Sequence, residues 1–212
     1  MRFTEARSRL ERLPSPLPRG RVDLTPTLLL RGEAPEALRL ATAGPVRDAA
    51  ALVLVYPGVG DEAYLVLTVR PVDDHAHAGQ VALPGGKREP GDDFPAGTAL
   101  REAAEEVGLD AVAAGVTVLG RLDDVDVRVT GFRMVPVLAV AERAPQLVAH
   151  DREVAAILRV PVRQFLSDAR IDVVEEDRAG LRLRYGAYPV QGHRVWGATG
   201  QVLAQLGAVL EE

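Results

Sequence analysis

Apolar positions follow two patterns along the chain, and the first of them predicts strands. Near-continuous apolar runs at 49–57 (AAALVLVYP) and 64–70 (YLVLTVR) are typical of buried strands, and the turn residues between them predict a hairpin. Shorter alternating runs extend this prediction to an extended piece ending in a turn at 79–86, strands within 116–127 and at 132–141, and a hairpin or extended pair within 181–197.

The second pattern has the helical period. It predicts short helices at 4–13, with Thr4 as N-cap, and at 35–43, and a helix over 98–108. It also predicts a short helix that follows the proline within 159–168, and an amphipathic helix at 197–212. Residues 14–26 carry four prolines and a glycine, which indicates an irregular connector. The segment 151–158 fits neither pattern clearly. Strands in hairpins with scattered helices, and no βαβ regularity, predict an α+β fold in which helices cover a sheet.

Composition and charge narrow the function classes. Apolar residues make up 47% of the 212 residues and aromatics 4%, so Leu, Val and Ala must fill the core. A formal net charge of −5 argues against nucleic acid as a partner, while a metal ion would still allow a small anionic substrate. The absence of cysteine excludes disulfides and thiolate metal sites and is compatible with the cytoplasm. We expect no secretory signal and no membrane partner, because apolar runs are too short.

Three carboxylates stand out on the helix expected at 98–108. At about 100° per residue, Glu102, Glu105 and Glu106 share one face, and an apolar face lies roughly opposite. Gly108 is placed for a left-handed C-terminal cap. Such a face is either simply solvated or a site for Mg²⁺ or Mn²⁺, which prefer hard oxygen ligands and keep positions open for phosphates. Like charges one turn apart repel, which adds weight to the metal interpretation.

The stretch GGKREPGDDFPAGTALREAAEEVGL, residues 85–109, resembles the Nudix box. It has a glycine, five residues, an acid, and then Arg-Glu-x-x-Glu-Glu-x-Gly. The acid is Asp92 rather than Glu, and eight residues rather than seven separate it from Arg101. Both departures are similar to those of the coenzyme A pyrophosphatase branch.

That branch also carries an upstream signature, which stands here as LVLTVRPVDDHAHAGQVALPGG at 65–86. Leu83 replaces the usual Phe, and His75 stands where Arg is expected. Downstream segments near 118–139 and 192–206 are similar as well, so the resemblance covers about 45–207. It implies a Nudix-type α/β/α sandwich at 45–212 with a mixed sheet and a catalytic loop-helix, preceded by an extension at 1–44 that packs on the core.

The resemblance implies metal-dependent hydrolysis of the pyrophosphate of coenzyme A, and possibly its thioesters, to adenosine 3′,5′-bisphosphate and 4′-phosphopantetheine. The implied Mg²⁺ or Mn²⁺ ligands are Glu102, Glu105, Glu106 and Gly86. The implied catalytic residues are Glu105, Arg101 and Glu153, with Glu105 and Glu153 as rival bases and Arg101 tying loop to helix by a bidentate carboxylate pair. The implied substrate-binding residues are Arg70, His77 and Lys87.

Several alternatives stay open at the level of sequence. Arg70 is equally consistent with a structural ion pair, and Glu153 with a solvated acid. Asp92 is consistent with a turn residue, a helix cap or a ligand. Trp196 suits the core better than a platform for a base. The substrate alternatives are ADP-ribose or a dinucleotide such as NADH, and a nucleotide sensor without catalysis is a further class. The sequence leaves the oligomeric state open.

Overall fold

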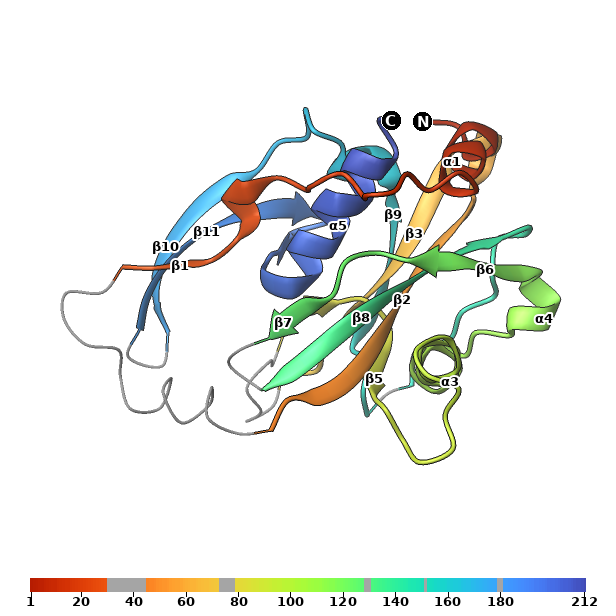
Figure 1. Cartoon of the computed structure of the whole chain (residues 1–212), viewed down its shortest axis with the longest axis horizontal. Helices are drawn as coiled ribbons and strands as arrows, with labels where there is room; N and C mark the ends of the chain where they lie inside the picture. Colours follow the sequence, from red (N-terminus) through yellow and green to blue (C-terminus); the bar gives the residue numbers. More distant parts are fainter. Residues whose placement is uncertain (30–44, 73–78, 128–130, 151, 179–180) are drawn as a thin grey trace.

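The computed structural model describes residues 1–29, 45–72, 79–127, 131–150, 152–178 and 181–212, and it contains two sheets with helices on both faces of the larger one (Figure 1). The main sheet has the order β4-β3-β2-β8-β6, with β5 on β2, β7 on β8 and β9 on β3. Its strands are β2 (Arg47–Pro57), β3 (Ala63–Val69), β4 (Val81–Ala82), β5 (Gly85–Lys87), β6 (Val116–Arg121), β7 (Val125–Val127), β8 (Phe132–Ala141) and β9 (Ala156–Pro161).

The main sheet is mixed, because β2 and β8 run parallel while its other pairs are antiparallel. The second, smaller sheet has the order β1-β11-β10, with β12 on β11. Its strands are β1 (Thr27–Leu28), β10 (Asp172–Arg178), β11 (Leu181–Val190) and β12 (His193–Val195). This sheet joins a strand from the beginning of the chain to strands from its end.

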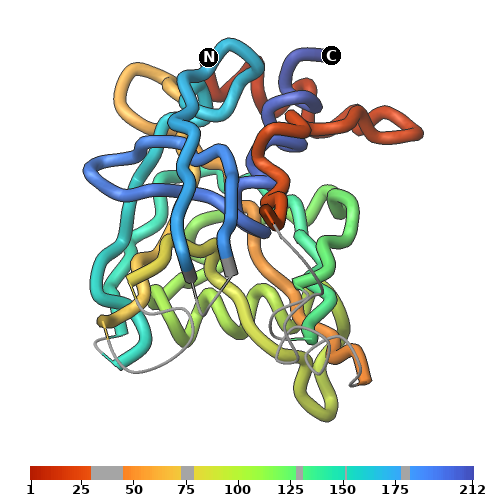
Figure 2. Tube along the Cα trace, turned by 90° about the vertical axis from the view of Figure 1, so that its left-hand side faces the viewer, coloured from red at the N-terminus to blue at the C-terminus, as the bar shows by residue number. Residues whose placement is uncertain are grey.

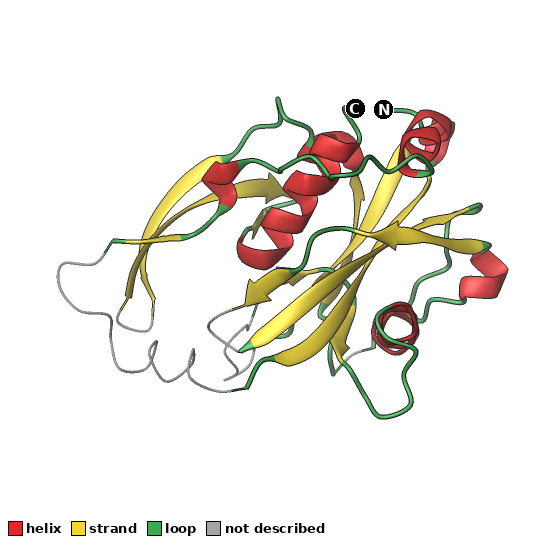
Figure 3. Ribbon diagram, in the orientation of Figure 1, coloured by secondary structure: helices red, strands yellow, loops and turns green. Residues whose placement is uncertain are grey.

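Helices separate and cover these sheets (Figure 3). The described helices are α1 (Phe3–Leu10), α3 (Ala96–Val107), α4 (Ala111–Ala114) and α5 (Gly197–Val209), with short 3-10 turns η1 (Val22–Leu24), η2 (Val59–Asp61) and η3 (Val162–Phe165). α3 packs on one face of the main sheet, and α1 and α5 on the other. The second sheet lies beyond α5, and both chain ends lie at the same end of the molecule (Figure 2).

Alternation along β2 divides the core into two parts. Ala51, Val53 and Val55 belong to the cluster under α1 and α5, whereas the even-numbered Ala50 to Tyr56 belong to the cluster under α3. Successive strand residues point to opposite faces, so a continuous apolar run is what a sheet covered on both faces requires. The apolar run at 49–57 that predicted a buried strand is therefore also explained by helices packing on both faces of the sheet.

The structure confirms the α+β class and the mixed sheet. It also confirms the hairpin of β2 and β3, the helix at α3 and the short helical turn after Pro161. The ambiguous segment near 151–158 contains a turn that leads into β9. The helix expected at 35–43 lies outside the described residues. Among the described helices, none is long and apolar enough to cross a membrane.

Three local expectations were wrong. Thr4 is not an N-cap: Arg2 holds that position, and the Thr4 hydroxyl donates to Asp61 at 2.9 Å from inside the helix. Gly85 and Gly86 open the extended strand β5 instead of forming a turn, because they pair with β2. α5 is not amphipathic, since a helix between two sheets is buried nearly all round; its buried residues include Val202, Leu203, Ala204, Gln205, Leu206 and Gly207.

Candidate functional site

The glutamate-bearing helix α3 is held to the main sheet by its small apolar side. Ala99, Ala103 and Val107 are buried against the even-numbered side of β2, as the period of the sequence requires. Gly108 ends the helix with φ at 64°, a left-handed conformation that glycine adopts without a steric penalty. The opposite side of α3 therefore presents its carboxylates towards the glycine strand β5 and the loop that follows it.

The glycine strand contacts two of the three glutamates. The N–H of Gly85 donates to Oε2 of Glu106 at 3.0 Å. Gly86 lies so close to Glu102 that a Cβ at this position would overlap its carboxylate. A side chain at this position would have to displace the Glu102 carboxylate, so the second glycine of the motif lets that carboxylate lie against the strand.

The loop between β5 and α3 is organised around Asp92. Arg101 donates to Asp92 through Nε and Nη2, each at 3.1 Å, which is the bidentate pair that the sequence predicted. Thr98 Oγ1 and the N–H of Glu89 donate to the same carboxylate at 2.8 and 2.9 Å. Arg101 holds the pKa of Asp92 well below its usual range, and the two other donors act in the same direction. Asp92 is thus the residue that fixes the loop to the helix.

Arg101 also separates the acidic side chains. Its guanidinium donates to Glu102 at 3.0 Å and to Glu105 at 2.9 Å, while Glu106 turns towards Gly85. Among the described residues, no three His, Asp or Glu side chains gather around one point as a preformed metal cage. The three carboxylates therefore do not converge on one point, since each accepts a hydrogen bond from a nearby donor. The role of Glu102, Glu105, Glu106 and Gly86 as metal ligands stays a prediction.

Burial controls the protonation of two of these glutamates. Glu106 is only 7% exposed, and burial raises its pKa to about 7 against the opposing effects of the Gly85 N–H and Arg70. Burial also raises the pKa of Glu102, with Arg101 opposing the shift. A buried carboxylate with a raised pKa has a strong preference for a nearby positive charge, which is typical of functional sites.

The segment before β9 brings Glu153 to the same region. The N–H groups of Val148 and His150 donate to the carbonyls of Val107 and Glu106 at 3.0 and 2.9 Å, so this segment is tied to the end of α3. Glu153 is exposed, and its charge contributes to the raised pKa of both Glu102 and Glu106. The structure thus brings the rival base close to the glutamates, although its catalytic role stays a prediction.

The candidate substrate-binding residues are placed unevenly. Arg70 directly follows β3, is exposed, and its charge acts on Glu106. Lys87 ends β5 with its ammonium exposed and 3.9 Å from Glu89, while its carbonyl accepts from Arg101 at 3.2 Å. Arg88 lies over the ring of Phe94, 5.3 Å from the centroid. His77 and His75 lie outside the described residues.

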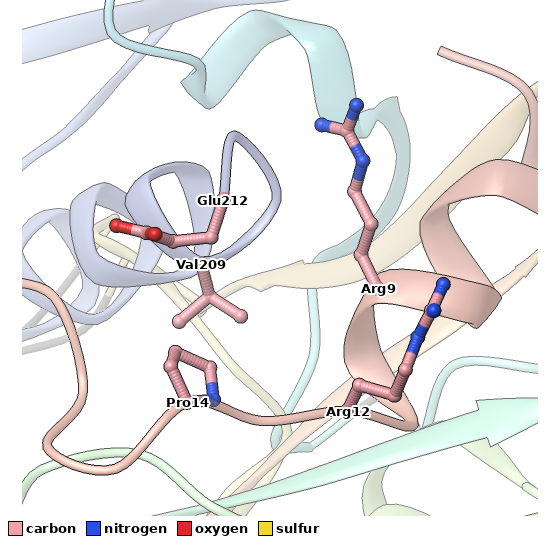
Figure 4. A pocket seen from close by; sticks show the side chains of 5 residues that line it. All are labelled: Arg9, Arg12, Pro14, Val209 and Glu212. Carbon is pink, nitrogen blue, oxygen red and sulfur yellow. The ribbon is translucent and has the colours of Figure 1, made fainter.

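A surface hollow on the other side of the molecule belongs to a different region (Figure 4). It is lined by Arg9, Arg12, Pro14, Val209 and Glu212, from α1, the connector and the end of the chain. Arg9 donates to the carbonyl of Leu210 and pairs with Glu5 at 2.9 Å, and Arg12 donates to Ser8. Arg9 therefore joins the beginning of the chain to its end, whereas the bond of Arg12 to Ser8 is local.

Comparison with known proteins agrees with the geometry. The family model described as the NUDIX domain matches residues 46–182. "Uncharacterized Nudix hydrolase NudL" proteins of Yersinia pestis and Yersinia pseudotuberculosis are each 34% identical over 145 residues, covering 68% of this chain and 71% of the relative. A solved Nudix hydrolase from M. smegmatis, RenU, is 30% identical with a TM-score of 0.48, covering 57% of this chain and 74% of its own. By the family model and the NudL relatives, this chain belongs to the Nudix family of hydrolases.

Proposed function

We propose that this Nudix hydrolase cleaves the pyrophosphate bond of coenzyme A with Mg²⁺ or Mn²⁺, and its thioesters are further candidate substrates. The observation that supports coenzyme A as the substrate is the sequence of segment 65–86. This segment resembles the coenzyme A pyrophosphatase branch and continues directly into the glycine strand β5. In the structure its last residues deliver the Gly85 N–H to Glu106. The segment that carries this resemblance thus leads, in the sequence, directly into the strand that contacts the acidic site.

The residues present fit a divalent cation. Glu102, Glu105 and Glu106 supply hard oxygen donors, and Gly86, without a side chain, lets the Glu102 carboxylate lie against β5. The Gly86 carbonyl is the fourth proposed donor. Burial raises the pKa of Glu106, and a bound cation would favour the charged form of this carboxylate. When bound, the cation would neutralise charge on the diphosphate and make a bound water more acidic.

The chain's own residues then perform the remaining tasks. Arg101, fixed by Asp92, holds the loop against α3 so that the glycine strand and the glutamates keep their positions. Glu105 or Glu153 accepts the proton of the attacking water, one P–O bond forms, and the P–O bond to the leaving phosphate breaks. Arg70, Lys87 and His77 are proposed to bind the diphosphate oxygens.

Mass spectrometry of the products tests this proposal. Purified protein is incubated with Mg²⁺ or Mn²⁺ and coenzyme A, dephospho-coenzyme A, ADP-ribose, NADH or a nucleoside triphosphate. We expect adenosine 3′,5′-bisphosphate and phosphopantetheine to form fastest, and Glu106→Gln to slow their formation by roughly 10² to 10³. Glu142→Gln, an exposed glutamate away from α3, is the matched control and should leave the rate unchanged.

Each other outcome has a distinct meaning. Preferred cleavage of ADP-ribose or NADH would retain the hydrolase and refute coenzyme A as substrate. Binding of nucleotide without cleavage of any compound would favour a sensor over an enzyme. A cytoplasmic location and a domain boundary near residue 45 are part of the same proposal. Of the N-terminal extension, residues 1–29 are described, and Phe3, Leu10 and Leu24 share a hydrophobic core with α5.

A further inference from the structure

The parallel strands β2 and β8 begin beyond the cover of the helices. In both strands the first three residues are exposed or half-buried, and full burial begins at Ala50 and Val135. Arg47 pairs with Phe132, its guanidinium lying over that ring at 4.0 Å from the centroid. Because odd-numbered residues of β2 point to the α5 side, this basic and aromatic pair lies on the face opposite α3.

The glycine strand connects this uncovered end to the glutamates. Gly86 pairs with Ala50 and faces α3, whereas Lys87 pairs with Ala49 and faces α5. Among the described strands β5 pairs only with β2, so it forms an edge at this point. One residue along β5 therefore separates the acidic site on one face from a lysine on the other, and a diphosphate at the edge would lie within reach of both.

An aromatic pair stands over the same end of the sheet. The rings of Tyr185 and Trp196 are stacked, with centroids 4.2 Å apart and planes 20° from parallel. Tyr185 is 3% exposed, while Trp196 is partly exposed. Trp196 directly precedes α5, which packs against β7, and directly follows β12, which lies beside β4. Ala82 at the end of β4 is three residues from Gly85, a span of at most about 11 Å.

We propose that Trp196 is the platform on which the base of the nucleotide substrate stacks. The buried Tyr185 ring fixes the orientation of the indole, so little side-chain freedom is lost on binding. Lys87 and Arg47, on the same face of the sheet, provide positive charge for the phosphate groups that flank the ribose. The inference rests on the proposed function only in requiring a nucleoside diphosphate derivative as substrate.

The chain contains a single tryptophan, so its intrinsic fluorescence reports on Trp196 alone. Glu106→Gln protein, in which turnover is strongly slowed, is titrated with adenosine 3′,5′-bisphosphate, ADP or ribose 5-phosphate, with free N-acetyltryptophanamide as the optical control. We expect saturable quenching by a compound with a base and none by ribose 5-phosphate. Unchanged emission while calorimetry records binding of both nucleotides would overturn the proposal. Quenching by ADP alone would support the platform and count against coenzyme A.

Kinetics give a second, independent test. Base stacking on an aromatic side chain contributes enough that Trp196→Leu should raise KM roughly tenfold, with kcat nearly unchanged. Trp196→Phe should restore most of the affinity, because it keeps an aromatic face. Val173→Ala, on an exposed position of the same small sheet, is the control.

A structural role for Trp196 predicts a different result. In that case Trp196→Leu would weaken hydrolysis equally for a diphosphate diester carrying a methyl group in place of the nucleoside. Circular dichroism of each variant establishes that it is folded before the kinetic comparison. An equal loss for both substrates would refute the platform, whereas a loss confined to the nucleoside-containing substrate would support it.

Discussion

The helices α3 and α5, which pack on opposite faces of the main sheet, are built in opposite ways. α3 buries only a narrow stripe of small side chains and uses Arg101 to hold Asp92, Glu102 and Glu105 in hydrogen bonds. α5 is buried nearly all round, and its buried polar side chains are limited to Thr199 and Gln205. Gln205 bonds to Asp123 and to the carbonyl of Pro18, which joins helix, loop and connector.

This difference separates chemistry from stability. A helix that packs on the sheet along one side and carries a polar network on the other can hold carboxylates in position, whereas a helix buried nearly all round contributes mainly to the free energy of folding. Substitutions on the reactive side of α3 should therefore reduce activity more than stability. Substitutions on α5 should do the reverse, and the following variants examine that contrast from the largest effect to the smallest.

Glu106→Gln should give the largest effect. We expect the hydrolytic rate to fall by roughly 10² to 10³, the cost of removing one preorganised electrostatic group. The free energy of unfolding should stay within about 1 kcal/mol, because the glutamine oxygen still accepts from Gly85. Steady-state kinetics and urea unfolding measure the two effects. Equal losses of activity and stability would remove the contrast between the helices.

Leu203→Ala should affect the other helix through stability. Leu203 is fully buried between the two sheets, so its truncation should lower the free energy of unfolding by about 3 kcal/mol. Leu100→Ala, at a half-buried position of α3, is the matched control with an expected loss of about 1 kcal/mol. Urea denaturation measures both. Activity per folded molecule should be unchanged by Leu203→Ala, and a large drop would place α5 in the catalytic machinery.

The contrast also explains what the sequence could predict. α3 was correctly expected because a helix with one apolar side has a clear period, and Gly108 marks its end. The bidentate pair of Arg101 was expected too. The central role of Asp92 was not predicted, because the sequence left it as a turn residue, a helix cap or a ligand. The available signal was its position after Gly91 in a tight loop. No local rule shows that Thr98 and Glu89 turn to the same carboxylate, since the folded loop brings them together.

The second sheet shows a different limit. β10 carries mostly charged residues, DVVEEDR, and pairs with β11 through alternating positions that include Glu175 opposite Arg184. Such a strand lacks the apolar run by which buried strands are recognised. β1 is only two residues long and pairs with β11, far away in the chain. α5 packs against β11, β7 and the 3-10 turns η1 and η3, which come from distant parts of the chain, so its all-round burial was equally hidden from a periodicity argument.

Asp92→Asn should have an intermediate effect on both quantities. The amide can accept fewer of the four hydrogen bonds and cannot pair bidentately with Arg101, so we expect activity to fall roughly tenfold as the loop loses its fixed position. Because the folded-state pKa of Asp92 is depressed, its carboxylate contributes stability above the unfolded-state pKa of about 4. That stability is lost as pH falls through the folded-state pKa.

Urea unfolding of wild type and Asp92→Asn across pH measures this linkage. The difference in free energy of unfolding should be constant at neutral pH and shrink as the medium becomes more acidic than pH about 4. Asp93→Asn, at the neighbouring aspartate, is the control. A difference independent of pH would mean that the charge of Asp92 does not contribute to the stability of the loop.

Thr4→Ala should have the smallest effect and distinguishes two structures for the start of α1. If Thr4 capped the helix, its loss would cost about 1 kcal/mol. In the structure the hydroxyl instead donates to Asp61 at an exposed position, and such a bond contributes only a few tenths of a kcal/mol. Thermal and urea unfolding of Thr4→Ala in wild type and in an Asp61→Ala background resolve this, because the cycle cancels the backbone effect of replacing Asp61 at its positive φ. A loss near 1 kcal/mol for Thr4→Ala in both backgrounds would restore the capping role. A small loss that disappears in the Asp61→Ala background would show that α1 is held by Phe3, Ala6 and Leu10 in the core.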